Sequence, residues 1–318
     1  MAKPAPYAST LAADAARVAE LAAIASYAQI GRGDEKAADQ LAVDAMRTAL
    51  NALDIDGKIV IGEGERDEAP MLYIGEKVGT GKGPAIDIAL DPLEGTTLTA
   101  KAMANALTVL AMSPGGGMLH APDTYMDKIA IGPGYKPGTV DLDMAPGDNV
   151  RSLASAKGVK PEDITVCVMD RPRHAELIAA LREVGARVLL ITDGDVAGVI
   201  HTAEPETGID LYLGSGGAPE GVLAASALKC VGGHFQGRLI FRNDVERGRA
   251  EKTGVTDFDR KYDLHELVSK DAIFAATGVT KGAMLDGVKV AGGFVTTHTL
   301  VMDSSTRTVQ RIRTIRPL

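Results

Sequence analysis

The junction at which the apolar run 85–90 ends in Asp91-Pro92-Leu93-Glu94-Gly95-Thr96-Thr97 constrains the fold more than any other stretch. The run is typical of a buried strand, and the glycine and hydroxyl residues after it are typical of a helix start. Asp91 and Glu94 lie three residues apart at the strand end, where their charges repel each other unless protons or a cation neutralise them. The backbone N–H groups of a helix start favour an anion. The junction therefore predicts a metal ion beside a phosphate group, which is the arrangement of a metal-dependent phosphatase.

The chain is long enough for one large domain or two ordinary ones, because it has 318 residues of which 45% are apolar. Its net charge of −8 argues against nucleic-acid binding through bulk electrostatics. It has no run of 18 apolar residues, and its N-terminus lacks the pattern of a secretory signal. We therefore expect a cytoplasmic protein that binds neither nucleic acid nor a membrane.

Cysteine and histidine usage points away from a zinc site. Cys167 and Cys230 lie in apolar contexts, which predicts two buried thiols, and no Cys-x-x-Cys occurs. The six histidines are scattered and form no His-Glu-x-x-His. A bound cation would therefore have oxygen ligands, which Mg²⁺ and Mn²⁺ prefer.

The first half of the chain is predicted to form two helices followed by short strands. The spacing predicts a helix over 9–30 that stops at Gly31, and a second one from the N-cap Asp34 to about Leu53. The apolar runs predict strands over 58–62, 85–90, 107–112 and 128–131. Residues 132–147 are dense in Gly and Pro, so we predict a domain boundary near residue 145, with domains 1–145 and 146–318.

The second half alternates between strands and helices. The apolar runs predict buried strands over 164–169, 187–191 and 209–213, with helices near 173–184, 195–201 and 219–231 and closing β segments over 290–303 and 308–315. This is βαβ order, so we expect an α/β fold with parallel or mixed sheets covered by helices.

Acidic residues gather where apolar elements end. Glu63 lies between two glycines after a strand, and glycines let the backbone turn sharply there. Asp39 lies within the second helix on a face with Ala42 and Val43, where a carboxylate needs a partner if it is buried. Asp67 and Glu68, in contrast, are expected to be solvated loop acids.

A second glycine-rich loop, 214–221, also follows a strand and opens a helix. It does not match the dinucleotide fingerprint Gly-x-Gly-x-x-Gly, because Pro219 occupies the place of the third glycine. Proline suits a first helical turn, so Glu220 would lie at a helix N-terminus. Glu220 is then either a well-placed helix-start acid or a further metal ligand.

Basic and polar residues follow other strands. Arg171 and Arg173 either bind phosphate bidentately or form an exposed basic turn. Asp193 and Asp195 either accept hydrogen bonds from sugar hydroxyls or cap a helix, and Tyr125 is either a hydroxyl donor or part of the core. Their shared location favours binding, because ligands gather at the carboxyl ends of strands in open α/β sheets.

Together these stretches resemble the class II fructose-1,6-bisphosphatases, a branch of the lithium-sensitive, metal-dependent phosphatase superfamily. The resemblance covers nearly the whole chain in order. The motifs that carry it are Gly31–Asp34 with Asp39, Val60–Glu65, Asp67–Glu76, Asp91–Thr96, Pro172–His174, Asp193–Val196 and Gly216–Val222.

The resemblance implies a layered α-β-α-β-α sandwich, the sugar-phosphatase fold. It implies Mn²⁺ or Mg²⁺ held by Asp39, Glu63, Asp91, Glu94 and Glu220. It implies that the substrate is lined by Glu94, Gly95, Thr96, Tyr125, Arg171, Pro172, Arg173, Asp193, Gly194, Asp195 and Gly217. A homo-oligomer, either a dimer or a tetramer, is also expected.

The activity that follows from this resemblance is hydrolysis of the 1-phosphate of fructose 1,6-bisphosphate, a step of gluconeogenesis. Metal would activate the attacking water and Thr96 would position it, while Arg171 and Arg173 would anchor the distal phosphate. The alternatives are a sedoheptulose-1,7-bisphosphatase, an inositol-phosphate phosphatase, a nucleotide-binding oxidoreductase or a non-catalytic sugar-phosphate sensor. The broken glycine fingerprint speaks against the oxidoreductase.

Overall fold

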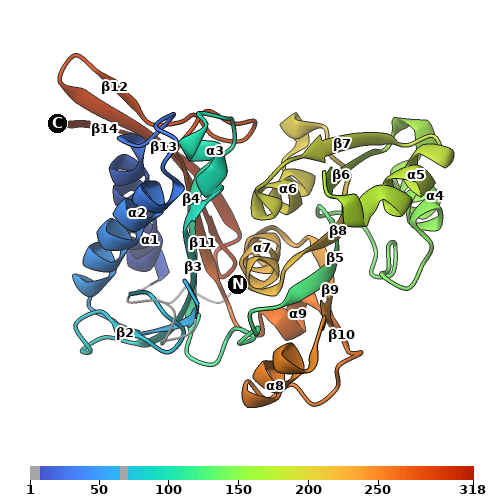
Figure 1. Cartoon of the computed structure of the whole chain (residues 1–318), viewed down its shortest axis with the longest axis horizontal. Coiled ribbons are helices and arrows are strands. Elements are labelled where there is room, and N and C mark those ends of the chain that lie inside the picture. The colour runs from blue at the N-terminus through green and yellow to red at the C-terminus, as the bar shows by residue number, and fades with distance from the viewer. Residues whose placement is uncertain (1–7, 65–70) are drawn as a thin grey trace. The chain divides into compact units, whose positions relative to one another are not determined.

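The computed structural model describes residues 8–64 and 71–318 and has a mixed α/β fold with two mixed sheets (Figure 1). This confirms the expected fold class. The chain divides into two compact units, the first formed by Met1–Leu119 with Val268–Leu318 and the second by His120–Leu267. Asp67 and Glu68 lie outside the described residues.

The division into units follows strand pairing rather than glycine and proline content. The predicted boundary near residue 145 lies inside the second unit, between β5 (Tyr125–Ile131) and α4 (Pro146–Lys157). The last strands of the chain return to the first unit, because β11 (Ile273–Gly278) pairs with β4 (Leu107–Pro114) over its whole length. The first unit is therefore built from two separate stretches of the chain.

The first unit contains a sheet in the order β12-β13-β11-β4-β3-β1-β2, with β14 paired to β13. Only β1 and β3 run parallel among the pairs of this sheet in the described residues. Its other strands are β1 (Asp56–Ile61), β2 (Lys77–Val78), β3 (Ala85–Glu94), β12 (Lys289–Ala291), β13 (Phe294–Asp303) and β14 (Thr308–Pro317).

Two long helices pack on this sheet, and the hydrophobic core of the first unit lies between the helices and the sheet (Figure 1). Helix α1 (Ala8–Tyr27) packs against β4, β11 and β13, and α2 (Glu35–Asn51) packs against α1, β3 and the short helix α3 (Thr96–Ala100). The predicted cap is confirmed, since the Asp34 side chain accepts a hydrogen bond of 2.9 Å from the N–H of Ala37. Apolar side chains of both helices meet those of β3 and β4 in one buried cluster.

The second unit contains a sheet in the order β10-β9-β5-β8-β6-β7. Strands β6, β7 and β8 run parallel, and β5 runs antiparallel to its neighbours β8 and β9. The carboxyl ends of β6, β7, β8 and β9 and the start of β5 therefore lie at one edge. The strands are β6 (Thr165–Met169), β7 (Arg187–Ile191), β8 (Leu211–Gly217), β9 (His234–Ile240) and β10 (Lys261–Asp263).

Helices connect these strands. They are α4, α5 (Ala175–Glu183), α6 (Asp195–Ile200), α7 (Ala218–Val231), α8 (Asp244–Lys252) and α9 (Leu264–Leu267), with 3₁₀ turns at Pro161–Asp163, Pro172–His174, His201–Ala203 and Pro205–Thr207. Three of the helices, α5, α6 and α7, were predicted, whereas α4, α8 and α9 were not. Helix α4 follows the Gly- and Pro-rich segment and was not predicted from its periodicity. Its start at Pro146 and its end at Gly158 in the left-handed conformation are the usual helix boundaries.

Two strands differ from their predictions. Strand β8 continues to Gly217 and α7 begins at Ala218, so residues 214–217, which were predicted to form a loop, belong to the strand. The sequence predicted that 187–191 is buried, but β7 lies at the edge of the sheet and Leu189 and Leu190 are 43% and 37% exposed. An edge strand is covered on fewer sides than a central one, and periodicity alone cannot tell the two apart.

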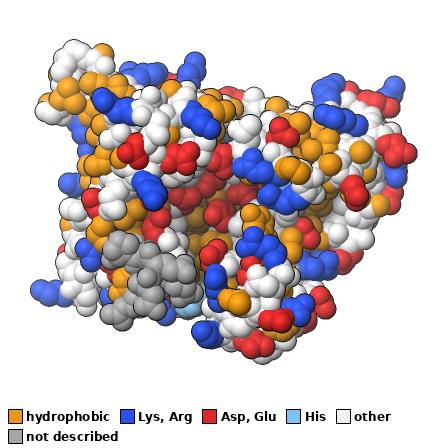
Figure 2. Space-filling view, in the orientation of Figure 1, with side chains coloured by type: hydrophobic (Ala, Val, Ile, Leu, Met, Phe, Trp, Pro, Cys, Tyr) orange, Lys and Arg blue, Asp and Glu red, His pale blue; other side chains and the backbone are white. Residues whose placement is uncertain are grey.

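Both cysteines are buried free thiols, as predicted, and burial raises the pKa of Cys167 to about 12. Within the described residues, no helix is both long and apolar enough to cross a membrane. Lys and Arg side chains are scattered over the face shown in Figure 2.

Candidate active site

Three of the predicted acids lie at one edge of the sheet in the first unit. Strands β1 and β3 run parallel, with Ile59 beside Ile88 and Ile61 beside Ala89, so their carboxyl ends meet at the same edge. Glu63 follows β1, whereas Asp91 and Glu94 are among the last four residues of β3. The fold therefore places acids that are about thirty residues apart in the sequence at the same end of the sheet.

The fourth acid, Asp39, comes to the same region from α2, which packs against β3. Burial, and to a smaller extent the negative charge of Asp91, raise the pKa of Asp39 to about 6. The two carboxylates are thus close enough to repel each other. A cation between them would offset this repulsion.

The end of β3 is irregular where the acids lie. The pairing with β4 shifts register between Asp91 and Glu94, and the Asp91 Oδ1 accepts a hydrogen bond of 3.0 Å from the N–H of Leu93. Glu94 is only 5% exposed. A strand that bends in this way turns successive side chains out of their ordinary alternation, which is common next to active sites.

Gly95 lets the chain pass from this strand into α3. Its φ is +90°, and a Cβ there would lie 2.7 Å from Cδ1 of Leu98. Thr96 is then the first residue of α3, which has five residues. The helix start after the acids is confirmed, although the helix is short.

The glycine on the N-terminal side of Glu63 is required by a close backbone approach. A Cβ on Gly62 would lie 2.1 Å from the carbonyl oxygen of Leu72, and that same oxygen accepts a hydrogen bond of 3.0 Å from the N–H of Glu63. The sharp turn that the sequence predicted after β1 is therefore present.

The donor set of the first unit suits a hard divalent cation. Asp39, Glu63, Asp91 and Glu94 offer carboxylate oxygens, the ligands that Mg²⁺ and Mn²⁺ prefer. Over residues 8–64 and 71–318, no three His, Cys, Asp or Glu side chains are already gathered closely enough to enclose an ion. The ligand set and the choice of metal therefore stay predictions.

The predicted substrate residues of the second unit lie at the common edge of its sheet. Tyr125 begins β5 and pairs with Gly217 at the end of β8. The other members follow neighbouring strands: Arg171, Pro172 and Arg173 come after β6, and Asp193, Gly194 and Asp195 come after β7. Their shared location, which was inferred from the sequence, is thus present within this unit.

Arg173 is held in place by uncharged groups of β8. Its Nε and Nη2 donate hydrogen bonds of 3.0 Å and 2.7 Å to the hydroxyl and the carbonyl of Ser215, and its guanidinium lies 5.0 Å from the centre of the Tyr125 ring. His174 supports Ser215, because its Nε2 accepts a hydrogen bond of 2.9 Å from the Ser215 N–H.

Asp195 lies deeper than the sequence suggested. Its Oδ2 lies 2.5 Å from the Nζ of Lys128, and the two side chains are 6% and 1% exposed. Gly194, with φ +82°, is the N-cap of α6, so Asp195 does not cap this helix. A Cβ on Gly216 would lie 2.0 Å from Asp195 Oδ2, so glycine at this position makes room for the ion pair.

Glu220 lies in the first turn of α7, as predicted, directly after Pro219, the second residue of the helix. Gly217 is the N-cap, and a Cβ there would lie 1.9 Å from Glu220 Oε2. Gly217 therefore lets the carboxylate approach the backbone closely. Glu220 belongs to the second unit, whereas the other four predicted ligands belong to the first.

Sequence reasoning missed two charged residues of the second unit. Lys128 looked like one residue of a short apolar strand, and only its buried partner Asp195 reveals its role. Arg242 follows β9 at the same sheet edge as Tyr125. The run before it, 235–241, is interrupted by Gln236, Gly237 and Arg238, so it gave a weaker strand signal than the apolar run before Arg171 and Arg173.

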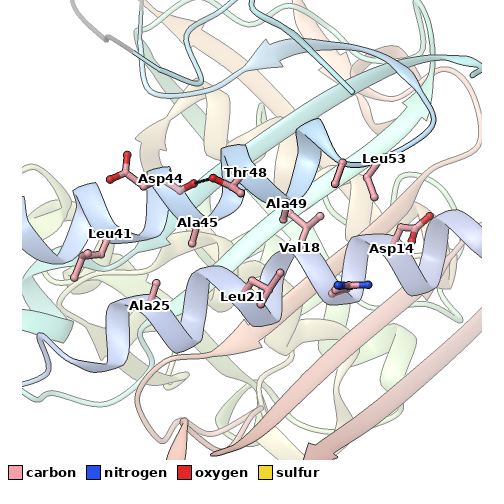
Figure 3. A pocket seen from close by; sticks show the side chains of 12 residues that line it. Asp14, Val18, Leu21, Ala25, Leu41, Asp44, Ala45, Thr48, Ala49 and Leu53 are labelled. Carbon is pink, nitrogen blue, oxygen red and sulfur yellow. Dashed lines mark hydrogen bonds between the residues drawn. The ribbon is translucent and has the colours of Figure 1, made fainter. Parts of the chain in front are cut away.

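A separate groove of about 670 Å³ runs along α1 and α2 and is open to solvent (Figure 3). Its wall is mostly aliphatic, and the Thr48 hydroxyl beside it donates a hydrogen bond of 2.7 Å to the Asp44 carbonyl. None of the predicted site residues lines this groove.

Comparison with known proteins gives consistent matches over nearly the whole chain. Residues 9–316 match the family model "Bacterial fructose-1,6-bisphosphatase, glpX-encoded". The chain is 47% identical to the class 2 fructose-1,6-bisphosphatase 1 of Escherichia coli strain K12 over 97% of this chain and 95% of that protein. It is also 47% identical to the class 2 D-fructose 1,6-bisphosphatase/sedoheptulose 1,7-bisphosphatase of Synechococcus sp. strain JA-3-3Ab, over 94% and 93% respectively.

Among solved structures, an inositol monophosphatase from Anabaena (Nostoc) sp. PCC 7120 is matched with a TM-score of 0.33 and 12% identity. The match covers 61% of this chain and 71% of that one. A likeness of this size carries no argument about the chain.

Proposed function

Because the chain belongs to the family of glpX-encoded bacterial fructose-1,6-bisphosphatases, we propose that it hydrolyses the 1-phosphate of fructose 1,6-bisphosphate with divalent cations bound. The products are fructose 6-phosphate and phosphate. The observation that carries the proposal is the 47% identity over 97% of the chain. The acids at the end of β3 support it, because they are the residues that a phosphate-bound cation needs.

The carboxylates of Asp39, Glu63, Asp91, Glu94 and Glu220 would hold Mg²⁺ or Mn²⁺. When bound, such ions offset charge on the transferred phosphoryl group and lower the pKa of the attacking water. Burial, and to a smaller extent the charge of Asp91, raise the pKa of Asp39 to about 6, and a bound cation would favour the charged carboxylate there. Thr96, which follows the last of these acids on β3 after one glycine, would orient the water through its hydroxyl.

The second unit would bind the part of the substrate that does not react. Arg173, with Arg171 nearby, would anchor the 6-phosphate, and Tyr125 would lie beside it. Asp193 and the segment Gly194–Asp195 would contact sugar hydroxyls. The burial of Asp195 against Lys128 favours a structural contribution, because one of its oxygens is already bound.

A second substrate has a specific observation in its favour. The Synechococcus relative is named both as a fructose 1,6-bisphosphatase and as a sedoheptulose 1,7-bisphosphatase, at the same identity of 47%. Both substrates carry two phosphates on a ketose. We therefore propose sedoheptulose 1,7-bisphosphate as an additional substrate, to be compared directly with fructose 1,6-bisphosphate.

The decisive experiment measures phosphate release from fructose 1,6-bisphosphate with added Mn²⁺ or Mg²⁺, and again after chelation. We expect turnover with the cation and loss of turnover after chelation. The carboxylates of β3 and the phosphoryl group are all negatively charged, so without a cation they repel each other. Added lithium is expected to lower the rate.

Sedoheptulose 1,7-bisphosphate and an inositol monophosphate serve as comparison substrates in the same assay. Release from the inositol phosphate alone would contradict the proposed specificity. Binding of the bisphosphate without release in the presence of Mn²⁺ would identify a sensor instead of an enzyme.

The role of Thr96 is tested by Thr96→Ala. We expect kcat to fall about 100-fold, as is typical when a reacting group is no longer oriented, while the KM for fructose 1,6-bisphosphate stays within a few-fold. Thr97→Ala is the matched control, since Thr97 is the next residue of the same helix. Equal rates for the two variants would remove Thr96 from the chemistry.

We further propose a cytoplasmic homo-oligomer. The two free, buried cysteines support a reducing compartment. Size-exclusion chromatography with light scattering distinguishes a monomer from a dimer or a tetramer.

A further inference from the structure

Arg242 lies where the sheet of the second unit collects its site residues. Tyr125 pairs with Ile240 of β9 on one side and with Gly217 of β8 on the other. Arg242 is two residues beyond Ile240, so it leaves the sheet at the same edge. Neighbouring strands are about 4.8 Å apart, which places the end of β9 within side-chain reach of the start of β5.

Two guanidiniums from different segments pack against one ring at this edge. The Arg242 Cζ lies 4.7 Å and the Arg173 Cζ 5.0 Å from the centre of the Tyr125 ring. The two positive charges are therefore within about 10 Å of each other, roughly one Debye length at physiological ionic strength. Their mutual repulsion is a cost that a bound dianion would reverse.

The position of Arg242 is fixed by a buried carboxylate. Glu246, whose side chain is 4% exposed, accepts hydrogen bonds of 2.7 Å from both the N–H and the Nε of Arg242, and one of 3.2 Å from the Thr124 hydroxyl. The hydrogen bond from the Arg242 side chain is the main cause that lowers the pKa of Glu246. A buried partner of this kind orients the guanidinium before any ligand arrives.

Arg242 nevertheless keeps donors for a ligand. Its side chain is 60% exposed, and a guanidinium has five N–H groups, of which Glu246 engages only part. The negative charge of Asp123 also acts on Arg242, but the Asp123 Oδ2 lies 3.5 Å from Nη1 of Arg249 and is paired with that arginine. The bonds of Arg173 go to uncharged groups of Ser215. The pair of arginines thus presents excess positive charge.

We propose that Arg242 is a second anchor for the phosphate that is not cleaved, and that with Arg173 it determines the preference for a sugar bisphosphate over a sugar monophosphate. This inference rests on the proposed function. Two arginines that approach one phosphate from different segments can each donate bidentate, charge-assisted hydrogen bonds. The sequence alone assigned this role to Arg171 and Arg173.

The test replaces Arg242 by Ala and compares two substrates that both carry the reacting 1-phosphate. For fructose 1,6-bisphosphate we expect KM to rise about 10- to 100-fold, the range for a lost hydrogen bond to a charged group, with little change in kcat. For fructose 1-phosphate, which lacks the distal phosphate, we expect no change in KM. Arg242→Lys should bring KM for fructose 1,6-bisphosphate part of the way back, since lysine keeps the positive charge but not the planar pair of donors of the guanidinium.

Arg238→Ala is the matched control. Arg238 also belongs to β9 and pairs with Asp143 at 2.7 Å, away from the Tyr125 ring. This variant should leave both KM values unchanged. If Arg242→Ala raises KM equally for both substrates, or for neither, the anchor role is wrong.

A stability effect is separated by a double variant. Arg242→Ala leaves Glu246 buried without its guanidinium, so Arg242→Ala/Glu246→Gln removes the stranded charge. A purely structural role predicts that the double variant regains the wild-type KM, whereas an anchor predicts that KM stays high.

A binding measurement separates this inference from the proposed function. Fructose 6-phosphate, which keeps only the distal phosphate, is titrated calorimetrically into the wild type, Arg242→Ala and Arg238→Ala. A wild type that hydrolyses no bisphosphate refutes the proposed function, while a weaker affinity of Arg242→Ala for fructose 6-phosphate still supports the anchor. Equal affinities of all three proteins overturn it.

Discussion

Asp91→Asn is expected to lower kcat for fructose 1,6-bisphosphate by about 100-fold or more, because even the hydrogen-bond partners of metal ligands are worth about 10- to 100-fold. Asn keeps the size of the side chain and one acceptor, so the hydrogen bond from the Leu93 N–H to Oδ1 can be kept. What is lost is a negative charge beside Asp39. The half-activating concentration of Mn²⁺ should therefore rise, and high Mn²⁺ should restore part of the rate.

Asp87→Asn is the matched control on the same strand. The Asp87 Oδ2 accepts hydrogen bonds of 2.7 Å and 3.0 Å from the N–H groups of Gly116 and Gly117, so its role is to hold a loop. Its replacement should lower the unfolding temperature and leave the Mn²⁺ requirement of the folded enzyme unchanged. An Asp91→Asn enzyme with wild-type turnover and metal requirement would remove β3 from the metal site.

Lys128→Met should destabilise the second unit by about 3–5 kcal/mol, the usual cost of removing one partner of a buried ion pair. Lys128 and Asp195 are 1% and 6% exposed, so the remaining carboxylate could not be hydrated. Denaturant unfolding followed by circular dichroism measures the change. The double variant Lys128→Met/Asp195→Asn should recover much of the loss, since no charge is then stranded.

Lys157→Met provides the comparison within the same unit. Lys157 pairs with Asp210, but its side chain is 38% exposed, and exposed pairs contribute about 0–1 kcal/mol. Equal losses for Lys128→Met and Lys157→Met would mean that burial does not decide the strength of these pairs.

Local patterns were sufficient for the features that depend on local chemistry. The Asp34 cap, the glycine turn before Glu63 and the proline start of α7 were all predicted, since each depends on neighbours a few residues away. The location of Arg173 and Asp193 at one sheet edge also followed, because β6 and β7 run parallel and strand polarity in βαβ units is constrained. Tyr125 reaches that edge from the start of the antiparallel strand β5, which the βαβ pattern does not predict.

Features that depend on distant partners were not visible in the sequence. The sequence around Lys128 does not predict its ion pair with Asp195, which is 67 residues away. The exposure of Leu189 depends on the edge position of β7, and the Arg242–Tyr125 contact depends on the antiparallel pairing of β9 with β5. Periodicity reports which face of an element is apolar, but it does not report which element covers that face.

The return of the chain to the first unit determines when the two units can form during translation. All residues of the second unit have been synthesised once the ribosome has passed Leu267. In the first unit, β4 is nearly all buried, and it can pair with β11 only after β11 has emerged from the ribosome. A nascent polypeptide released before residue 273 would carry the acids of β3 on a sheet with an open, apolar edge, a template for aggregation. Termination between residues 267 and 273 should therefore yield an insoluble product rather than a weakly active one.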